Sequence, residues 1–325
     1  TWPDGLRLRC ASALARAREE LAEDIAFWQG VQYLFFSQWG RLHGYARAAG
    51  VRIMGDLPFY VAEDSADVWS HPEQFQLDAD LRPVEIAGVP PDGFSDIGQL
   101  WGNPLFAWDR MKADGYDWWC RRIAFQLRLY DILRIDHFRG FDSYFAIPAG
   151  AVTAAGGRWR NGPGIDLFRV LEQRLGRCDI VAEDLGYLTP SVHRLLEDSG
   201  FPGMKVLEFA FDTRDGSGAT YLPFAYPTNC IAYVGTHDND TVQGWWDKAA
   251  EPVKELAGRR RRPRPRVSSP RPGRGRGLGH DARHLGERRG HRRGADAGPA
   301  GAGQRGADQH ALHARRQLGL AGAPG

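Results

Sequence analysis

Four acidic residues each stand at the end of a short apolar segment, and they are the first candidates for catalytic groups. They are Asp56, Asp136, Glu183 and Asp238. Two carboxyl groups held about 5–5.5 Å apart can cleave a glycosidic bond with retention, because one attacks the anomeric carbon while the other protonates the leaving oxygen. A single acid at a strand end is more often a helix cap or part of a loop salt bridge. Spacing alone therefore predicts an α/β enzyme that uses carboxylates, and it leaves the substrate open.

A cation stands beside one of these acids. Arg134 precedes Asp136 by two residues, and alternate residues of a strand point to the same face. A permanent positive charge next to a carboxyl group favours its ionised form. An ionised carboxylate suits a nucleophile, so this pairing favours Asp136 for that role.

Parallel strands are the elements that would bring the acids together. The apolar segments typical of strands cover residues 51–56, 132–136, 179–183, 205–210 and 231–238. Helical spacing of apolar residues covers 12–49, 116–130, 166–175 and 191–198. Strands that alternate with helices predict a parallel sheet, either closed as a barrel or left open. At the mouth of a barrel, acids far apart in the sequence converge.

The segment between residues 61 and 108 is too long for a simple strand-to-helix connection. It contains Pro-Pro, several glycines and five aromatic residues, among them Trp101. Long loops in compact domains are usually functional, so we expect this segment to lie over the site.

Charge divides the chain into two parts near residue 258. Residues 259–325 contain 17 Arg, four acidic residues and no Lys or aromatic residue, a net charge of +13. Residues 1–258 contain 36 acidic against 25 basic residues, a net charge of −11. An acidic body gives no reason to expect a nucleic-acid partner. We expect a catalytic body over 1–257 and a tail over 258–325 that cannot bury a core and is disordered.

Cysteine spacing and hydropathy bear on the compartment. The four cysteines lie dozens of residues apart and form no CxxC pair, which predicts free thiols and neither a disulfide framework nor a zinc site. No apolar run approaches the ~20 residues that span a bilayer, and nothing resembles a signal peptide. We therefore expect a cytoplasmic protein without a membrane partner.

Seven ordered segments of the body carry more information than spacing. They are 55–62 (GDLPFYVA), 64–69 (DSADVW), 87–92 (AGVPPD), 98–105 (GQLWGNPL), 134–141 (RIDHFRGF), 182–186 (AEDLG) and 235–241 (GTHDNDT). Together they resemble the amylomaltase (disproportionating enzyme, 4-alpha-glucanotransferase) family. The resemblance implies a partial (β/α)8 TIM barrel of the α-amylase-like glycosidase type, with about five of the eight strands present and with long active-site loop insertions.

The resemblance also implies an activity. It is the transfer of α-1,4-glucan segments between maltooligosaccharides by a retaining double displacement, with these glucans as partners and with no cofactor and no metal. An α-amylase-type hydrolase, which uses water as the acceptor, is one alternative, and segments 64–69 and 98–105 favour the transferase. A second alternative is an inactive, truncated or frameshifted relative of the transferase.

Residue roles follow from the same resemblance. Asp136 would be the nucleophile that forms a covalent glucosyl-enzyme, Glu183 the general acid/base, and Asp238 the group that holds the sugar hydroxyls. The expected substrate-binding residues are Asp56, Tyr60, Phe94, Trp101, Arg134, His137, His237 and Asn239. Within that set Arg134 would orient Asp136, and His237 would bind a hydroxyl of the donor glucose. The rings of Tyr60 and Trp101 would stack on sugars.

The chain departs from the family pattern at three places. Gly93 stands where the family has Tyr, so an aromatic cover for bound glucan is missing. Residues 1–7 resemble a mid-chain segment, so the first two barrel strands are expected to be absent. From a point between 254 and 262 the sequence fits an out-of-frame translation, because a one-nucleotide shift over 315–322 permits the family's closing motif. The competing interpretation of the tail, a basic arm for RNA or DNA, is disfavoured by its lack of Lys and aromatic residues.

Overall fold

The computed structural model describes residues 2–91, 95–186, 188–211 and 217–261. The chain divides into two units, Thr1–Arg264 and Pro265–Gly325, and the described residues all belong to the first. Most of the predicted tail therefore lies outside the described residues, whereas the region proposed for the start of the frame shift, 254–262, is described up to residue 261. Helix α10 (Glu251–Arg261) runs across the predicted boundary at residue 257, which stays a prediction.

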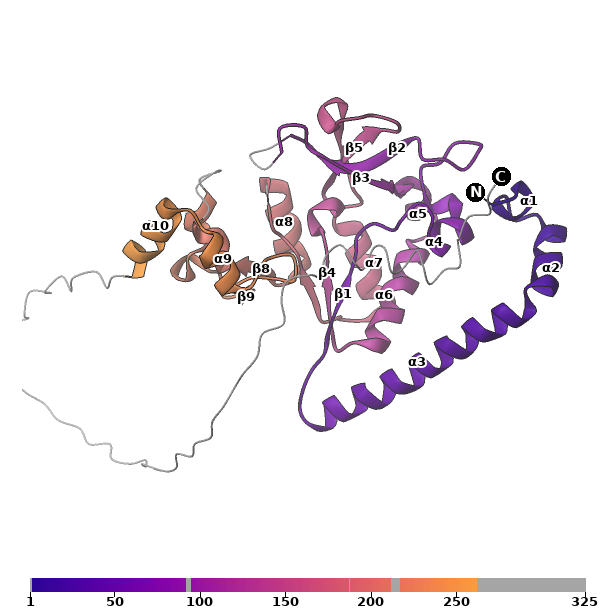
Figure 1. Cartoon of the computed structure of the whole chain (residues 1–325), viewed down its shortest axis with the longest axis horizontal. Coiled ribbons are helices and arrows are strands. Elements are labelled where there is room, and N and C mark those ends of the chain that lie inside the picture. Colours follow the sequence, from indigo (N-terminus) through magenta and orange to yellow (C-terminus); the bar gives the residue numbers. More distant parts are fainter. Residues whose placement is uncertain (1, 92–94, 187, 212–216, 262–325) are drawn as a thin grey trace, which may run out of the picture. The chain divides into compact units, whose positions relative to one another are not determined.

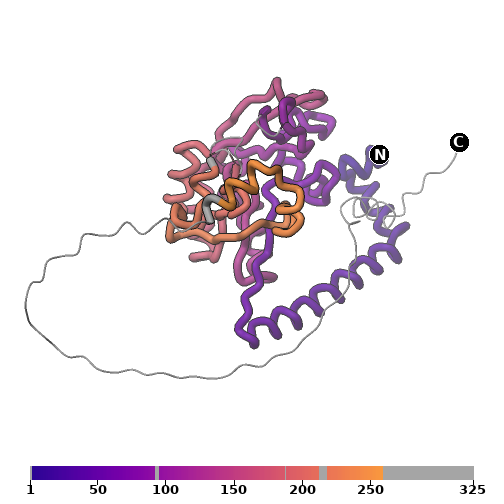
Figure 2. The backbone as a smooth tube through the Cα atoms, turned by 60° about the vertical axis from the view of Figure 1, so that its left-hand side comes forward, coloured from indigo at the N-terminus to yellow at the C-terminus, as the bar shows by residue number. Residues whose placement is uncertain are grey.

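Three helices open the chain. α1 (Asp4–Arg7), α2 (Ala11–Glu20) and α3 (Ala22–Ala48) replace the single helical stretch predicted over 12–49. The stretch ends at Gly50, whose φ of 73° is a conformation that glycine adopts without steric cost. α3 runs outside the strands for most of its length in both views (Figure 1 and Figure 2). Many of its apolar side chains are exposed to solvent.

Polar contacts join the end of α3 to the strands. Asp131 lies 2.8 Å from His43 Nε2, accepts a 2.6 Å hydrogen bond from Arg47 and accepts another of 2.9 Å from the Ile53 N–H. These contacts hold the pKa of Asp131 well below its usual range, with the Ile53 N–H as the largest cause. The indole N–H of Trp39 donates to the Leu129 carbonyl at 2.9 Å. Polar contacts therefore anchor the C-terminal end of α3, whereas many apolar side chains along the helix stay exposed to solvent.

Three parallel strands form the centre of the fold. β1 (Met54–Leu57), β4 (Ile132–Ile135) and β7 (Ile180–Ala182) pair in the order β1-β4-β7. Asp56 lies opposite Arg134, and Ile135 lies opposite Ala182. The sequence predicted all three strands from their short apolar segments. In the structure most of their side chains are buried, as is typical of parallel strands.

A second parallel pair continues this arrangement. β8 (Gly203–Val206) pairs with β9 (Cys230–Tyr233). The Ala182 N–H of β7 donates to the carbonyl of Pro202, directly before β8, at 2.9 Å. The strand predicted over 205–210 is wrong from Leu207 onwards, where a 3-10 helix begins. Its partner β9 stops at Tyr233, and the Glu208 N–H instead donates to the Val234 carbonyl at 3.1 Å.

Three helices connect these strands. α6 (Asp117–Leu129), α7 (Ile165–Leu175) and α8 (Pro190–Ser199) match the helices predicted from apolar spacing. Each buries one face in the core through side chains such as Trp119, Leu167 and Val192. α8 carries Pro190 in its first turn and ends at Gly200, whose φ is 69°.

The long segment that was predicted as a loop contributes two strands to an antiparallel sheet. The strands of the sheet are β2 (Glu85–Val89), β3 (Gln99–Pro104), β5 (Ser143–Pro148) and β6 (Arg158–Asn161), in the order β3-β2-β5-β6. In Figure 1 the labelled strands of this sheet, β2, β3 and β5, lie at the top, on the side towards which β1 runs. Buried Glu85 ties β2 to β6 through Arg158 at 3.0 Å and Arg160 at 2.7 Å.

Short elements complete the described chain. They are α4 (Ala66–Ser70), η1 (Pro72–Gln74), α5 (Trp108–Ala113), η2 (Phe138–Phe141), η3 (Ala154–Gly156), η4 (Leu207–Phe211), η5 (Ser217–Tyr221), η6 (Pro223–Ala225) and α9 (Val242–Lys248). The four cysteines are free, as predicted. Among the described residues, no helix combines the length and the apolar character needed to cross a bilayer.

Candidate active site

An arginine joins two of the predicted carboxylates at the ends of β1 and β4. Arg134 Nη1 lies 2.6 Å from Asp56 Oδ1, and Nη2 lies 2.9 Å from Asp136 Oδ1. The guanidinium is 8 % exposed, whereas the two carboxylates are about two-fifths exposed. A fork-shaped cation with several donors can hold two carboxylates at once in this way. The predicted pairing of Arg134 with Asp136 is therefore confirmed as a contact.

Glu183 lies on the neighbouring strand end and is held by the backbone. Because Ile135 pairs with Ala182, the next residue of each strand brings Asp136 and Glu183 to the same edge. The His137 N–H donates to Glu183 Oε2 at 2.8 Å, and the Leu185 N–H donates to Oε1 at 2.9 Å. Both carboxylate oxygens thus have a fixed donor, and the side chain is buried.

The two carboxyl groups have different proton affinities. Burial, followed by the nearby charge of Asp136, raises the pKa of Glu183 to about 7, although the two N–H donors and Arg134 oppose the rise. Burial also raises the pKa of Asp136 above its ordinary value, and Arg134 opposes this rise. Arg134 thus favours the ionised form of Asp136, as predicted, but desolvation of the strand end is the larger effect on this pKa.

His137 takes part in an aromatic cluster next to the carboxyl pair. Its ring centroid lies 4.9 Å from that of Trp101 and 6.1 Å from that of Tyr60. Desolvation, together with the charge of Arg139, lowers the pKa of His137 to about 4. Burial raises the pKa of Tyr60 far above its ordinary value. Both side chains are therefore neutral near pH 7 and form an uncharged wall.

The third carboxylate stands on a turn after β9. His237 Nε2 lies 3.6 Å from Asp56 Oδ2 and 3.4 Å from Asp238 Oδ1, and both His237 and Asp238 are about two-thirds exposed. Asn239 Oδ1 accepts hydrogen bonds from the Thr236 N–H at 2.9 Å and the Thr236 hydroxyl at 3.0 Å. The carboxamide oxygen of Asn239 therefore stabilises its own turn. That contact is not the substrate contact expected for Asn239.

The structure thus brings most predicted residues to one edge of the strands. Direct contacts link Asp56, Arg134 and Asp136, and they continue through His237 to Asp238. The predicted residue Phe94 lies outside the described residues. Within the part of the chain that the structure describes, no group of three His, Cys, Asp or Glu side chains could hold a metal ion.

Sequence reasoning missed two residues that support the site. Asp184 is buried, and its Oδ1 accepts a 2.6 Å hydrogen bond from the Met204 N–H of β8. A Cβ on Gly203 would stand 2.7 Å from the Asp184 carboxylate oxygens, so only glycine leaves them room. The signal was available, because Asp184 belongs to the segment 182–186 that carried the resemblance.

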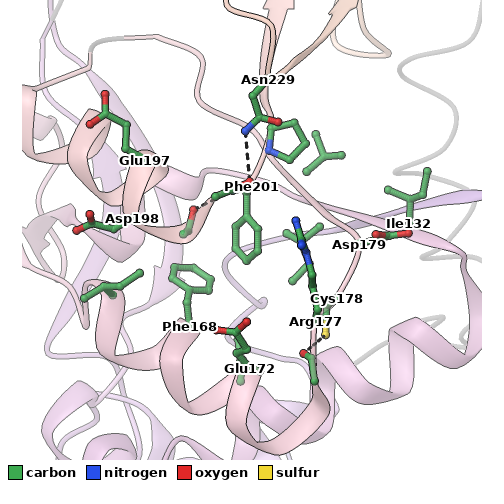
Figure 3. Close-up of a pocket in the computed structure, with 18 of the residues that line it drawn as sticks. Ile132, Phe168, Glu172, Arg177, Cys178, Asp179, Glu197, Asp198, Phe201 and Asn229 are labelled. Atoms are coloured by element: carbon green, nitrogen blue, oxygen red, sulfur yellow. Dashed lines mark hydrogen bonds between the residues drawn. The ribbon is translucent and has the colours of Figure 1, made fainter.

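Two pockets differ in their relation to these residues. One of about 290 Å³ is lined by Asp56, Arg134, Met204, Tyr233 and His237, and it borders the carboxylate edge. Another of about 600 Å³ lies where β4 and β7 begin, with Ile132, Asp179 and Phe201 in its wall (Figure 3). None of the predicted site residues lines the larger pocket, so volume does not identify the site.

Comparisons with known proteins agree with one another. Residues 1–272 match the family described as 4-alpha-glucanotransferase. The 4-alpha-glucanotransferase of Thermus thermophilus is 50% identical over 260 residues, which are 79% of this chain and 52% of that protein. The one from Clostridium butyricum is 47% identical over 248 residues, 76% of this chain and 50% of that protein. The chain therefore spans about half the length of these curated relatives.

A solved structure extends the similarity to three dimensions. The amylomaltase from Streptococcus agalactiae, in complex with acarbose, superposes with a TM-score of 0.76 at 44% sequence identity. The match covers 81% of this chain and 53% of that chain. The described α/β fold is therefore similar to that of an amylomaltase.

Proposed function

The chain belongs to the 4-alpha-glucanotransferase family, and we propose that it transfers α-1,4-glucan segments between maltooligosaccharides. The carboxyl pair at the ends of β4 and β7 carries the proposal. Asp136 contacts a buried cation, and Glu183 has a pKa of about 7. A cation-supported nucleophile and an acid that keeps its proton near neutral pH are the two groups that retaining transfer requires. The acarbose complex of the relative supports an α-glucan as the substrate class.

The first half-reaction would use Asp136 as the nucleophile. Its carboxylate oxygen forms a bond to the anomeric carbon of the donor while the bond from that carbon to the glycosidic oxygen breaks. Glu183 gives its proton to the departing oxygen, and the shortened glucan leaves. Arg134 holds the carboxylate of Asp136 in position at 2.9 Å during the attack.

The second half-reaction would restore both carboxyl groups. A hydroxyl of the acceptor glucan attacks the anomeric carbon, the bond to Asp136 breaks, and ionised Glu183 takes the hydroxyl proton. Water in place of the acceptor would give hydrolysis. The aromatic wall of Tyr60, Trp101 and His137 supports the glucan as acceptor, since sugar rings stack on such surfaces.

The remaining roles are assigned in the same proposal. Asp238 and His237 would bind hydroxyl groups of the donor sugar, and their exposure leaves their polar atoms accessible to it. Asp56 would hold both Arg134 and His237, which it contacts at 2.6 and 3.6 Å.

We also propose that β1, β4, β7, β8 and β9 are five successive strands of a (β/α)8 barrel. Their parallel pairing, their order and the hydrogen bond from Ala182 to Pro202 support this arrangement. The Tyr233 hydroxyl of β9 lies 3.7 Å from Met54 Sδ of β1, which supports a curved wall of strands. The four free thiols support the cytoplasm as the compartment.

Incubation with maltotriose tests the proposed transfer. The expected products are glucose and a series of longer maltodextrins, resolved by chromatography. Asp136→Asn and Glu183→Gln should abolish the series, because each removes one of the two reacting groups. Asp179→Asn is a matched control, since that carboxylate stands at the other end of β7 and should leave the product pattern unchanged. Shortened products without longer ones would overturn the proposal in favour of a hydrolase.

A further inference from the structure

The residue after Asp136 has an unusual backbone. His137 adopts φ 47° and ψ 47°, in the left-handed region that residues other than glycine adopt uncommonly and in which histidine, Asn and Asp are more frequent than the other types. Such a conformation persists only where the surroundings enforce it. β4 ends at Ile135, two residues before His137, and the His137 N–H donates to a side chain instead of to a neighbouring strand.

That N–H is bonded to Glu183. It donates to Oε2 at 2.8 Å, while the Leu185 N–H donates to Oε1 at 2.9 Å. The two donors come from different strand ends and grip opposite oxygens of one carboxylate, so together they define its rotation. The general acid/base is thus oriented by peptide groups, whose positions depend on local backbone conformation.

The imidazole ring of His137 is fixed by packing on two sides. Its centroid lies 4.9 Å from the Trp101 ring and 5.8 Å from the Phe59 ring. A Cβ on Gly140 would stand 3.0 Å from His137 Cδ2 and 2.6 Å from the Phe59 ring, so glycine leaves both rings their space. The ring therefore has little freedom to rotate. Its packing stabilises the left-handed backbone conformation of His137, the residue whose N–H donates to Glu183.

We propose that His137 is a positioning residue for Glu183, which it orients through its main-chain N–H while its ring anchors the left-handed backbone against Trp101 and Phe59. The inference rests on the proposed function only in naming Glu183 as the acid/base. It assigns His137 a task that differs from the substrate binding expected of this residue. It also links the aromatic wall mechanically to the acid/base.

Amide NMR of the whole chain tests the hydrogen bond without any need for turnover. An N–H that donates to a carboxylate shifts when the carboxylate ionises. The His137 and Leu185 amide protons should therefore titrate together, with an apparent pKa near 7 as expected for Glu183. Both titrations should vanish in Glu183→Gln. A His137 amide that is insensitive to pH over this range while the Leu185 amide responds would overturn the proposal.

Two substitutions separate the backbone from the ring. His137→Asn keeps a residue that tolerates the left-handed region, whereas His137→Val brings a β-branched side chain that does not. In the Val variant the Glu183 pKa should rise by about one unit, the expected effect of losing one hydrogen bond to the charged form. In the Asn variant it should stay closer to the parent value. Equal pKa values in both variants would contradict the proposal.

The pH profile of transfer gives a second readout. Its alkaline limb should move upwards with the Glu183 pKa in His137→Val and return towards the parent in His137→Asn. If the Val variant does not fold, Gly140→Ala replaces it, since the added methyl group presses on the rings of Phe59 and His137. Absence of transfer in the parent chain would overturn the proposed function, yet the amide titration would still decide the role of His137.

Discussion

At the scale of the residue, Glu183 and Asp136 differ because their partners differ. Glu183 accepts two peptide N–H groups and is buried, whereas Asp136 is about two-fifths exposed and faces Arg134. Burial raises the pKa of both carboxyl groups and is the larger effect at each; the nearby charge of Asp136 adds to the rise at Glu183, whereas the contact with Arg134 opposes the rise at Asp136. Under the proposed function, adjacent strand ends would thus supply an acid and a nucleophile from the same functional group.

The raised pKa of Glu183 predicts how stability depends on pH. Its pKa lies near 7 in the folded chain and near 4.5 in the unfolded one, so between these values the folded state binds the extra proton. Stability must then fall as pH rises from about 4.5 to 7, by up to about 3 kcal/mol, and level off above 7. Glu183→Gln lacks this loss. Urea unfolding of both chains from pH 4.5 to 8 should show the variant gaining on the parent across that window, and a constant difference would contradict the pKa.

At the scale of the element, the parallel strands were predictable and the antiparallel sheet was not. Short apolar segments that end in Asp56, Asp136 and Glu183 carry the signature of buried strands, and β1, β4 and β7 follow it. The strands β2 and β3 lie in the segment that was predicted as a loop, and they carry glycine, proline and polar residues that break the pattern of a strand. Their pairing depends on partners distant in the sequence, such as Ile86 with Ile147, which local spacing does not encode.

The candidate site was likewise predictable only in part, namely in those features that the local sequence pattern encodes. Carboxylates at strand ends and their order along the chain were visible in the sequence. The left-handed backbone of His137 and the inward carboxamide of Asn239 depend on tertiary contacts, so residue type alone does not reveal them.

The junction between β7 and β8 gives a prediction for one glycine. Gly203→Ala would place a methyl group 2.7 Å from the Asp184 carboxylate, which must then release the Met204 N–H or shift the strand. The expected loss is about 1–3 kcal/mol of unfolding free energy. Gly156→Ala is the matched control, because a Cβ there meets nothing within 4 Å. Equal unfolding midpoints for the two variants would show that the junction accepts the methyl group.

At the scale of the whole molecule, the described unit combines a buried aromatic core with an apolar helix surface. Trp119, Phe138 and Phe141 are fully enclosed. On α3, by contrast, Phe27 is 63% exposed, Leu34 56% and Phe35 50%. Contiguous apolar surface of this kind favours association with another apolar surface.

The exposed face of α3 therefore predicts self-association at micromolar concentration. Replacing Phe27, Leu34 and Phe35 together by Gln should raise the monomer fraction in sedimentation velocity and lower the binding of a dye that reports apolar surface. Val152→Gln is the control, since Val152 is 87% exposed but stands outside α3. A parent chain that sediments as a monomer at these concentrations would contradict the prediction.

The division of the strands into two pairing groups has a consequence for how the site could be lost. Asp136 and Glu183 belong to the three-stranded group, while His237 and Asp238 follow β9 of the other pair. Proteins open in cooperative patches of unequal stability. The amides of β8 and β9 should therefore exchange with deuterium faster than those of β4 and β7. When the β8–β9 pair opens, Asp238 would move away from the site while Asp136 and Glu183 stay in place. The chain would then spend part of its time folded at its centre but without the third carboxylate of the candidate site.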